Sequence, residues 1–175
     1  MRNIILTTGL LLLGLNLIKA QNDELKPFRI EVGGRLGASS GGYWGDELYT
    51  GYSFYMEPKY QLTNRYALGL LIEGDLFSTF GYDGLYFRGH YPRILLTGDY
   101  YYKIEHEKNK ASFAGIGLGP IVAPYGETNP HFILRTGHEK SSFRLTVSIG
   151  LTVNTRKPYL NAGISFGYVF RSKKK

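Results

Sequence analysis

The chain has 175 residues, a formal net charge of +7, 23 Gly, 15 Tyr and 10 Phe, and no Cys. This length is sufficient for one domain with its own core, and the abundance of aromatic residues and Gly is typical of an all-β protein. The absence of Cys excludes a disulfide scaffold, a zinc–thiolate site and a lipoprotein anchor on Cys.

The N-terminal segment has the features of a secretory signal peptide. Arg2 precedes a mainly apolar run from Ile4 to Ile18, and Ala20 supplies the small residue of a cleavage site. An uncleaved membrane helix is the alternative, but the run is shorter than the roughly 20 residues that a span needs. We therefore predict a signal peptide over residues 1–20 and a mature chain over 21–175, whose net charge would be +5 because two basic residues and no acid are removed.

The next four segments alternate between apolar and polar residues, as half-buried strands do. They are FRIEVGGRLGA from Phe28, GYSFYMEPKYQL from Gly51, RYALGLLIEGDLF from Arg65 and PRILLTGDYYYKI from Pro92. Pro58 lies inside the second of these segments. Because proline lacks a backbone N–H donor, it predicts a bulge or a local distortion there.

Four further segments complete the pattern. They are KASFAGIGLGPIV from Lys110, HFILRTGHE from His131, SFRLTVSIGLTV from Ser142 and YLNAGISFGYVF from Tyr159. The first two are less regular, with Ile116 and Leu118 on the predicted apolar face of one and Phe132 and Leu134 on that of the other. The sequence thus predicts eight strands and no helix in the mature chain.

The connections between these segments alternate in length. Long stretches, SSGGYWGDELYT and STFGYDGLYFRGH, follow the first and third segments, whereas TNR, EHEKN and EKS are short. APYGETNP is intermediate, and NTRK is shorter than the alternation predicts. Short turns at one end and long loops at the other are typical of an up-and-down barrel in an outer membrane.

Eight alternating strands in an exported chain fit either of two barrels. A soluble lipocalin-like barrel has an apolar interior and a polar surface, and a membrane barrel has the reverse. The polar faces here are rich in Gly, Ala and Ser, which suit a narrow interior better than a soluble surface. We therefore predict an all-β fold, an eight-stranded antiparallel up-and-down transmembrane β-barrel.

The charged residues on the polar faces are isolated from one another and carry both signs. Side chains fill the interior of an eight-stranded barrel, where charges must be paired or hydrogen-bonded. The near balance of charge predicts a closed polar lumen rather than an open pore, and Lys103 and Arg135 add to the charge of these faces. The predicted lumen charge network comprises Arg29, Glu31, Arg35, Glu57, Lys59, Glu73, Asp75, Arg93, Asp99 and Arg144.

The final segment is the most specific part of the sequence. It carries a polar residue, a Gly two positions later and then spaced aromatic residues, namely Asn161, Gly163, Phe166, Tyr168 and Phe170. Together with the eight-strand pattern over residues 27–171, it resembles the small eight-stranded outer-membrane barrels of the OmpA/OmpX type, within the outer-membrane β-barrel domain family. The resemblance implies that these five residues form a signal for the barrel-assembly machinery. The tail RSKKK departs from the family, whose members often stop on the terminal aromatic residue.

The resemblance also implies a location and partners. An outer-membrane β-barrel domain over residues 21–175 would lie in the outer membrane of a Gram-negative bacterium, in contact with membrane lipid and lipopolysaccharide. The even number of strands would place both termini in the periplasm. The basic residues are scattered, which argues against nucleic acid as a partner, and we expect a monomer without a cofactor.

Patterns typical of catalysis or metal binding are weak. The four His residues, His90, His106, His131 and His138, have no metal-ligand spacing. Some barrels of this size are lipid A deacylases or acyltransferases, and His138 lies three residues before Ser141. However, GHEKSS is more simply a polar turn and does not match the His-x-Ser-Asn pattern of that family. We expect neither a catalytic residue nor a metal site.

The long loops are the remaining candidate functional surface, because loops on a rigid scaffold commonly carry recognition. Alternatively, their aromatic residues only complete the outer girdle of the barrel. The predicted function is a structural or surface-interaction role through the extracellular loops, with an extracellular ligand as a partner of these loops. The alternatives are a porin-like channel for small solutes and, less favoured, a lipid A-modifying enzyme. The candidate loop residues are Tyr43, Trp44, Tyr82, Tyr86 and Phe87.

Overall fold

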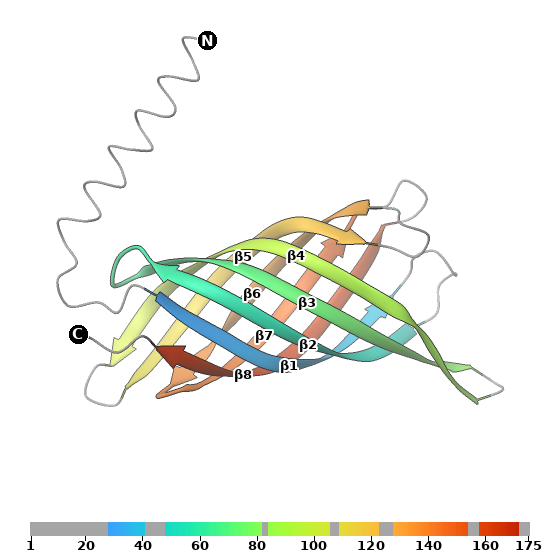
Figure 1. Cartoon of the computed structure of the whole chain (residues 1–175), viewed down its shortest axis with the longest axis horizontal. Coiled ribbons are helices and arrows are strands. Elements are labelled where there is room, and N and C mark those ends of the chain that lie inside the picture. Colours follow the sequence, from blue (N-terminus) through green and yellow to red (C-terminus); the bar gives the residue numbers. More distant parts are fainter. Residues whose placement is uncertain are drawn as a thin grey trace, which may run out of the picture.

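The computed structural model describes residues 28–40, 48–81, 84–105, 109–122, 128–153 and 158–171. The predicted signal peptide and the loop residues Tyr43, Trp44 and Tyr82 lie outside these ranges. Antiparallel strands form one closed barrel in which neighbours in the chain are neighbours in space and the last strand pairs with the first (Figure 1). The strands are β1 (Phe28–Ser40), β2 (Leu48–Gln61), β3 (Tyr66–Gly81), β4 (Gly84–Glu105), β5 (Lys110–Val122), β6 (Thr128–Lys140), β7 (Phe143–Thr152) and β8 (Tyr159–Arg171).

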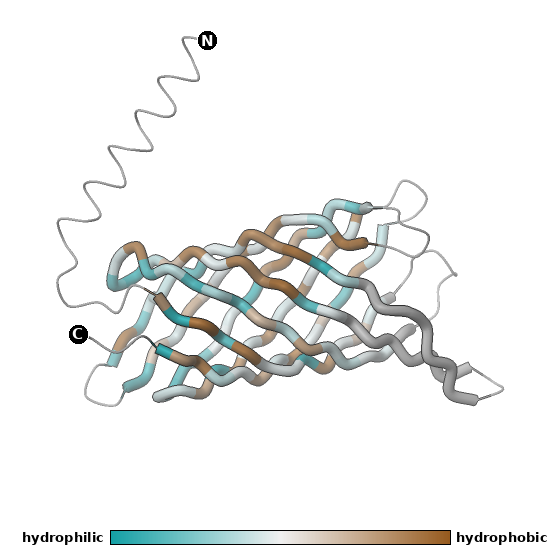
Figure 2. Tube along the Cα trace, viewed as in Figure 1, coloured by the Kyte–Doolittle hydropathy of each residue, from teal (hydrophilic) through white to brown (hydrophobic). Residues whose placement is uncertain are grey.

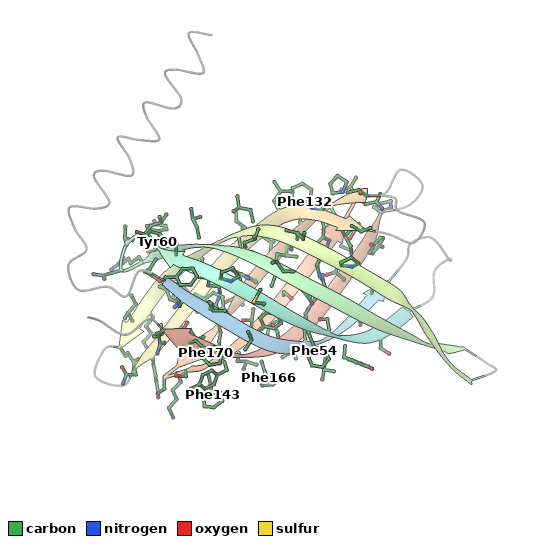
Figure 3. All side chains as sticks on the ribbon, viewed as in Figure 1. Phe54, Tyr60, Phe132, Phe143, Phe166 and Phe170 are labelled. Atoms are coloured by element: carbon green, nitrogen blue, oxygen red, sulfur yellow. The ribbon has the colours of Figure 1, made fainter. Side chains whose placement is uncertain are left out.

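The two faces of the barrel wall have opposite character, which confirms the predicted fold class. In β7, Leu145, Val147 and Ile149 are exposed, and the residues between them are buried in the interior. The less regular segments behave in the same way, with Ile116 of β5 and Leu134 of β6 facing outward. Hydrophobic and hydrophilic residues are interleaved along the strands (Figure 2). Aromatic side chains that project from the outer wall include Phe54, Phe132, Phe143, Phe166 and Phe170 (Figure 3).

Glycine allows the wall to close where β1 meets β8. Gly33 and Gly167 are register partners across this seam. A Cβ atom at Gly33 would lie 2.8 Å from the Cα of Gly167 and would collide with the carbonyl oxygen of Phe166. The hydroxyl of Tyr55 fills the remaining space, 2.7 Å from the same Cβ position. The small residues predicted on the lumen side are therefore required by the narrow interior.

The distortion predicted at Pro58 occurs on one side of β2, and a register shift lies elsewhere. Pro58 pairs with Ile30 in an unbroken β1–β2 register, so there is no bulge on that side. The β2–β3 ladder skips Glu57 and Pro58 between the pairs Met56–Ile72 and Lys59–Gly69, so a local distortion does occur at the proline. The β4–β5 ladder shifts between Tyr101 and Lys103. Because the shift changes which face a residue occupies, Lys103 is 65% exposed and pairs with Glu105 rather than facing the lumen.

The third connection is not the long loop that the sequence predicts. The β3–β4 ladder continues to the pair Gly81–Gly84, so most of STFGYDGLYFRGH is paired strand and Tyr86 and Phe87 belong to β4. A stretch rich in Gly and aromatic residues is compatible with either a loop or a strand. Here the backbone pairing between β3 and β4 makes it a strand. The hairpin extends at the end of the barrel opposite the start of β1 and the end of β8 (Figure 1).

Candidate functional site

The interior of the barrel is filled by charged side chains. Six cations and five carboxylates are buried among the described residues. They form three groups along the barrel axis: a central cluster, a mouth cluster at the end with the short turns, and an outer cluster toward the other end. The central cluster consists of Glu31, Glu57, Lys59, Asp99, Arg135 and Arg144.

Asp99 of β4 is the hub of the central cluster. Its carboxylate accepts hydrogen bonds from Lys59 Nζ at 3.1 Å and from Arg144 Nη2 at 2.7 Å. Arg135 contacts the other carboxylate oxygen through Nε at 2.9 Å. Three cations from three strands therefore contact one buried carboxylate. Buried charges are tolerated when they are paired and hydrogen-bonded in this way.

The other two carboxylates of the cluster complete this compensation. Arg135 donates to both oxygens of Glu57 at 2.7 and 3.0 Å, a bidentate pair. Lys59 Nζ lies 2.9 Å from Glu31 and 3.0 Å from Glu57. The Tyr55 hydroxyl donates to Glu31 at 2.7 Å. The cluster thus contains equal numbers of cations and carboxylates, which span the lumen from β1 to β7.

The mouth cluster consists of Arg29, Tyr101, Glu139 and Arg171. Arg29 and Arg171 are register partners across β1 and β8, and Glu139 of β6 forms an ion pair with each, at 3.2 Å for Arg29. Arg144 Nη1 donates to the Tyr101 hydroxyl at 2.9 Å and so connects this cluster to the central one. The opening at the short-turn end is therefore crossed by bonded side chains.

The outer cluster consists of Arg35, Glu73, Arg93 and His131. Arg93 donates to Glu73 at 2.9 Å, and Arg35 Nη1 lies 3.5 Å from the same carboxylate oxygen. His131 is fully buried, with Nε2 3.3 Å from Arg93 Nη1 and Nδ1 2.8 Å from the Thr152 hydroxyl. This arrangement fixes the imidazole by a bond at each ring nitrogen.

An apolar layer separates the central and outer clusters on one side of the lumen. Tyr55, Leu71, Leu95 and Ile133 pack together there although they occupy lumen-facing positions. A cavity of about 30 Å³ adjoins this layer, and another of about 20 Å³ lies near Arg35. Because one water needs about 10–15 Å³ by this measure, the two cavities have room for at most about three and two waters, respectively.

The predicted lumen network and the observed clusters largely coincide. Nine of its ten residues are buried in the lumen, and eight of these bond to other members of the network, whereas Arg29 bonds to Glu139 and Tyr101. The side chain of the tenth residue, Asp75, lies outside the described part of the structure. Two lumen residues are missing from the predicted network: Glu139, which was predicted to lie in the polar turn GHEKSS, and His131, the first residue of the predicted segment. The alternation of β6 continues through both residues, and the whole of this 13-residue strand shows it.

His138 and Ser141, a possible catalytic pair in the sequence, are not hydrogen-bonded to each other in the described part of the structure. His138 Nδ1 bonds instead to the Ser112 hydroxyl at 2.8 Å, and Ser141 is a turn residue with a φ of 56°.

The described residues contain no group of three potential metal ligands. The side chains of His90 and His106 lie outside the described part. No helix in the described ranges is long and apolar enough to cross a membrane.

The C-terminal strand places the predicted assembly signal on both faces of the wall. Asn161 is buried and accepts a hydrogen bond from Arg35 at 3.3 Å. Phe166, Tyr168 and Phe170 face outward, and the rings of the last two lie 4.8 Å apart. Whether the assembly machinery reads these residues stays a prediction.

A closed barrel of eight strands with a polar lumen and an apolar outer wall defines the class of small outer-membrane β-barrels. Comparison with known proteins supports this class at the level of the fold. No protein family and no curated protein matches the sequence.

Several solved structures are similar to this chain. Neisserial surface protein A is 11% identical with a TM-score of 0.59, and the match covers 83% of this chain and 97% of that one. The outer membrane protein Ail of Yersinia pestis is 15% identical over 80% and 99% of the two chains, with a TM-score of 0.42. The outer membrane protein AlkL is 13% identical over 85% and 92%, with a TM-score of 0.44. At 11% identity, the similarity to Neisserial surface protein A shows a shared fold.

Proposed function

We propose that this chain is an integral outer-membrane protein of a Gram-negative envelope, exported by the predicted signal peptide and assembled through its C-terminal strand. Its lumen is closed, and its role is structural or is interaction at the cell surface. The observation that carries the proposal is the central cluster, whose ion pairs cross the lumen from wall to wall. The short-turn end, where β1 begins and β8 ends, faces the periplasm.

The outer wall supports placement in lipid. Leu134 of β6 lies between Ile116 of β5 and Ile149 of β7, and these neighbouring side chains are 59–67% exposed. A soluble protein rarely exposes so broad a contiguous apolar surface. In a bilayer the same surface is the part of the barrel that contacts the acyl chains.

Replacement of Leu134 by Arg tests this placement. We expect the variant to lose about 2–4 kcal/mol of folding free energy in a bilayer, because a charge at mid-depth must leave water. Thr128→Arg, at the outer end of the same strand, should lose at most about 1 kcal/mol. Urea unfolding in lipid vesicles, followed by heat-modifiable gel migration, measures both. Equal stability of the two variants, or a wild-type chain that stays folded and soluble without detergent, would contradict the placement.

Conductance in planar bilayers separates the closed barrel from the porin-like alternative. We expect the wild-type chain to give no steady single-channel current under conditions in which an open porin conducts. The reason is that the ion pairs of the central cluster cross the lumen from wall to wall. Reproducible currents of porin size would instead support a small-solute channel.

A role at the cell surface is supported by the extended hairpin. The β2–β3 pairing reaches Ser78 and the described β4–β5 pairing reaches Arg93, whereas β3 and β4 remain paired to Gly81 and Gly84. Beyond the barrel this hairpin presents strand edges, which can pair with an added strand of another protein. The candidate residues Tyr86 and Phe87 lie in this part of β4.

A further inference from the structure

Two lysines lie directly opposite each other on the outer wall at the short-turn end. Lys110 begins β5, Lys140 ends β6, and the two are exposed register partners. Opposed residues of neighbouring strands have Cβ atoms only about 4.5–5.5 Å apart, and like charges in this position are destabilising. Within the described part of the chain, neither ammonium group forms an ion pair.

Elsewhere the barrel places a counter-ion between opposed like charges. Glu31 and Glu57 are register partners across β1 and β2, and Lys59 Nζ lies about midway, 2.9 and 3.0 Å from the two carboxylates. The opposed arginines of the mouth cluster are bridged in the same way by a carboxylate. Lys110 and Lys140 have the same register relation, but no carboxylate of the described residues bridges them. An anion from outside the chain could therefore take the bridging position.

The backbone holds the two lysines in place. Asn109 and Ser141, the turn residues next to them, both have positive φ values, 48° and 56°. The N–H of Ser141 donates to the carbonyl of Asn109 at 2.8 Å, which ties the two turns together. The positions at which the two lysine side chains leave the wall are therefore fixed relative to each other.

An aromatic surface adjoins the lysine pair. Phe143 is the register partner of Lys140 and is 68% exposed. Its ring meets that of Tyr168 edge to face at 5.5 Å, and Tyr168 in turn contacts Phe170. Phe143 and Phe170 project from the wall on the same side of the barrel (Figure 3). Aromatic side chains of this kind favour the boundary between headgroups and acyl chains.

The carboxylate beside Lys110 is paired with a different lysine. Glu105 is the register partner of Lys110 on its other side, but its carboxylate lies 2.8 Å from Lys103 Nζ. One step deeper along the same face, His138 bonds to the Ser112 hydroxyl through Nδ1. Its Nε2 can donate to an anion held by the lysines.

We propose that Lys110 and Lys140 bind the phosphate of an anionic glycerophospholipid in the leaflet at the short-turn end, with an acyl chain against Phe143 and Tyr168. This inference rests on the proposed membrane placement. Charge complementarity selects an anionic headgroup, and the adjoining aromatic surface selects a lipid rather than a free phosphate ester. The site binds its ligand without changing it chemically.

The proposal is tested by native mass spectrometry of the full chain in a non-ionic detergent. The measured quantity is the dissociation constant of the first bound phosphatidylglycerol. At about 1 kcal/mol for each basic residue, K110Q and K140Q should each weaken this binding about fivefold. R65Q is the matched control, because Arg65 is an exposed cation in another turn at the same end and bonds to Tyr100. It should change the constant less than twofold.

Two further ligands test whether the bound anion is a lipid headgroup or a free phosphate ester. Phosphatidylethanolamine, which carries no net charge, should bind more weakly than phosphatidylglycerol and should not distinguish the variants. Glycerol phosphate should not displace the lipid. Unchanged binding in both lysine variants, an equal loss in R65Q, or displacement by glycerol phosphate would each overturn the proposal. Heat-modifiable migration of the same samples reports folding, so failure of the barrel itself is recognised separately.

Discussion

Replacement of Asp99 by Asn is expected to destabilise the folded barrel by about 3–5 kcal/mol, because it leaves buried cations without their shared carboxylate. Lys59, Arg135 and Arg144 all bond to this side chain, at 2.7–3.1 Å. Asn keeps the volume but brings an amide N–H₂ group, which cannot accept from the cations. Glu31 and Glu57 each contact two of the three cations and cannot replace a hub that contacts all of them.

The measurement is urea unfolding of D99N in lipid vesicles, followed by far-ultraviolet circular dichroism and by gel migration. Glu105→Gln is the matched control, because it also removes one carboxylate from a lysine partner in β4, but at the exposed end of the strand. Exposed ion pairs contribute little to stability, so the control should unfold close to the wild-type midpoint. If D99N and E105Q unfolded together, the central cluster would contribute no more than a surface pair.

A double-mutant cycle separates charge compensation from loss of packing. D99N combined with R144Q removes a cation together with part of its counter-charge, so the double variant should be more stable than the sum of the two single changes predicts. We expect a coupling energy of at least about 1 kcal/mol between the two positions. Strict additivity would mean that the 2.7 Å contact between Asp99 and Arg144 is energetically unimportant.

The wall of the barrel is predictable from the sequence because its two faces meet different environments. A period of two residues therefore marks each strand, and it places Leu134 outside and Arg135 inside although their segment is the least regular one. The extension of β3 and β4 has no comparable signal. Its strands are defined by pairing with each other up to Gly81 and Gly84, and pairing between two segments is not encoded in the alternation of either.

Within the lumen, the sequence predicts which residues face inward but not which of them meet. Arg29 and Glu139 are 110 positions apart and become partners only through the stagger of the closed barrel. The register shift after Tyr101 similarly moves Lys103 from the predicted lumen face to the surface. A one-residue shift in register moves the side chains beyond it to the opposite face of the wall. A short polar stretch gives no sequence pattern from which such a shift could be predicted.

Replacement of Gly33 by Ala is expected to cost about 3 kcal/mol, at the upper end of overpacking effects, although it adds only one methyl group. The new Cβ would meet the backbone of β8, at the Phe166 carbonyl and 2.8 Å from the Cα of Gly167. Backbone atoms of a paired strand cannot move aside as a side chain does, so the β1–β8 seam must open. Gly98→Ala is the matched control, since its nearest neighbour would be the end of Leu68 at 3.8 Å.

A variant of Tyr55 separates two possible causes of the destabilisation in G33A: a clash with the backbone of β8 and a clash with the Tyr55 hydroxyl in the lumen. Its hydroxyl lies 2.7 Å from the Cβ position of Gly33, so a side-chain clash is the competing cause of any destabilisation. Tyr55→Phe removes this hydroxyl and leaves the backbone of β8 where it is. We expect G33A to be no more stable in the Y55F background, as measured by urea unfolding in vesicles beside G98A and Y55F alone. Full recovery would assign the cost to the tyrosine, and a near-neutral G33A would show that the seam tolerates the methyl group.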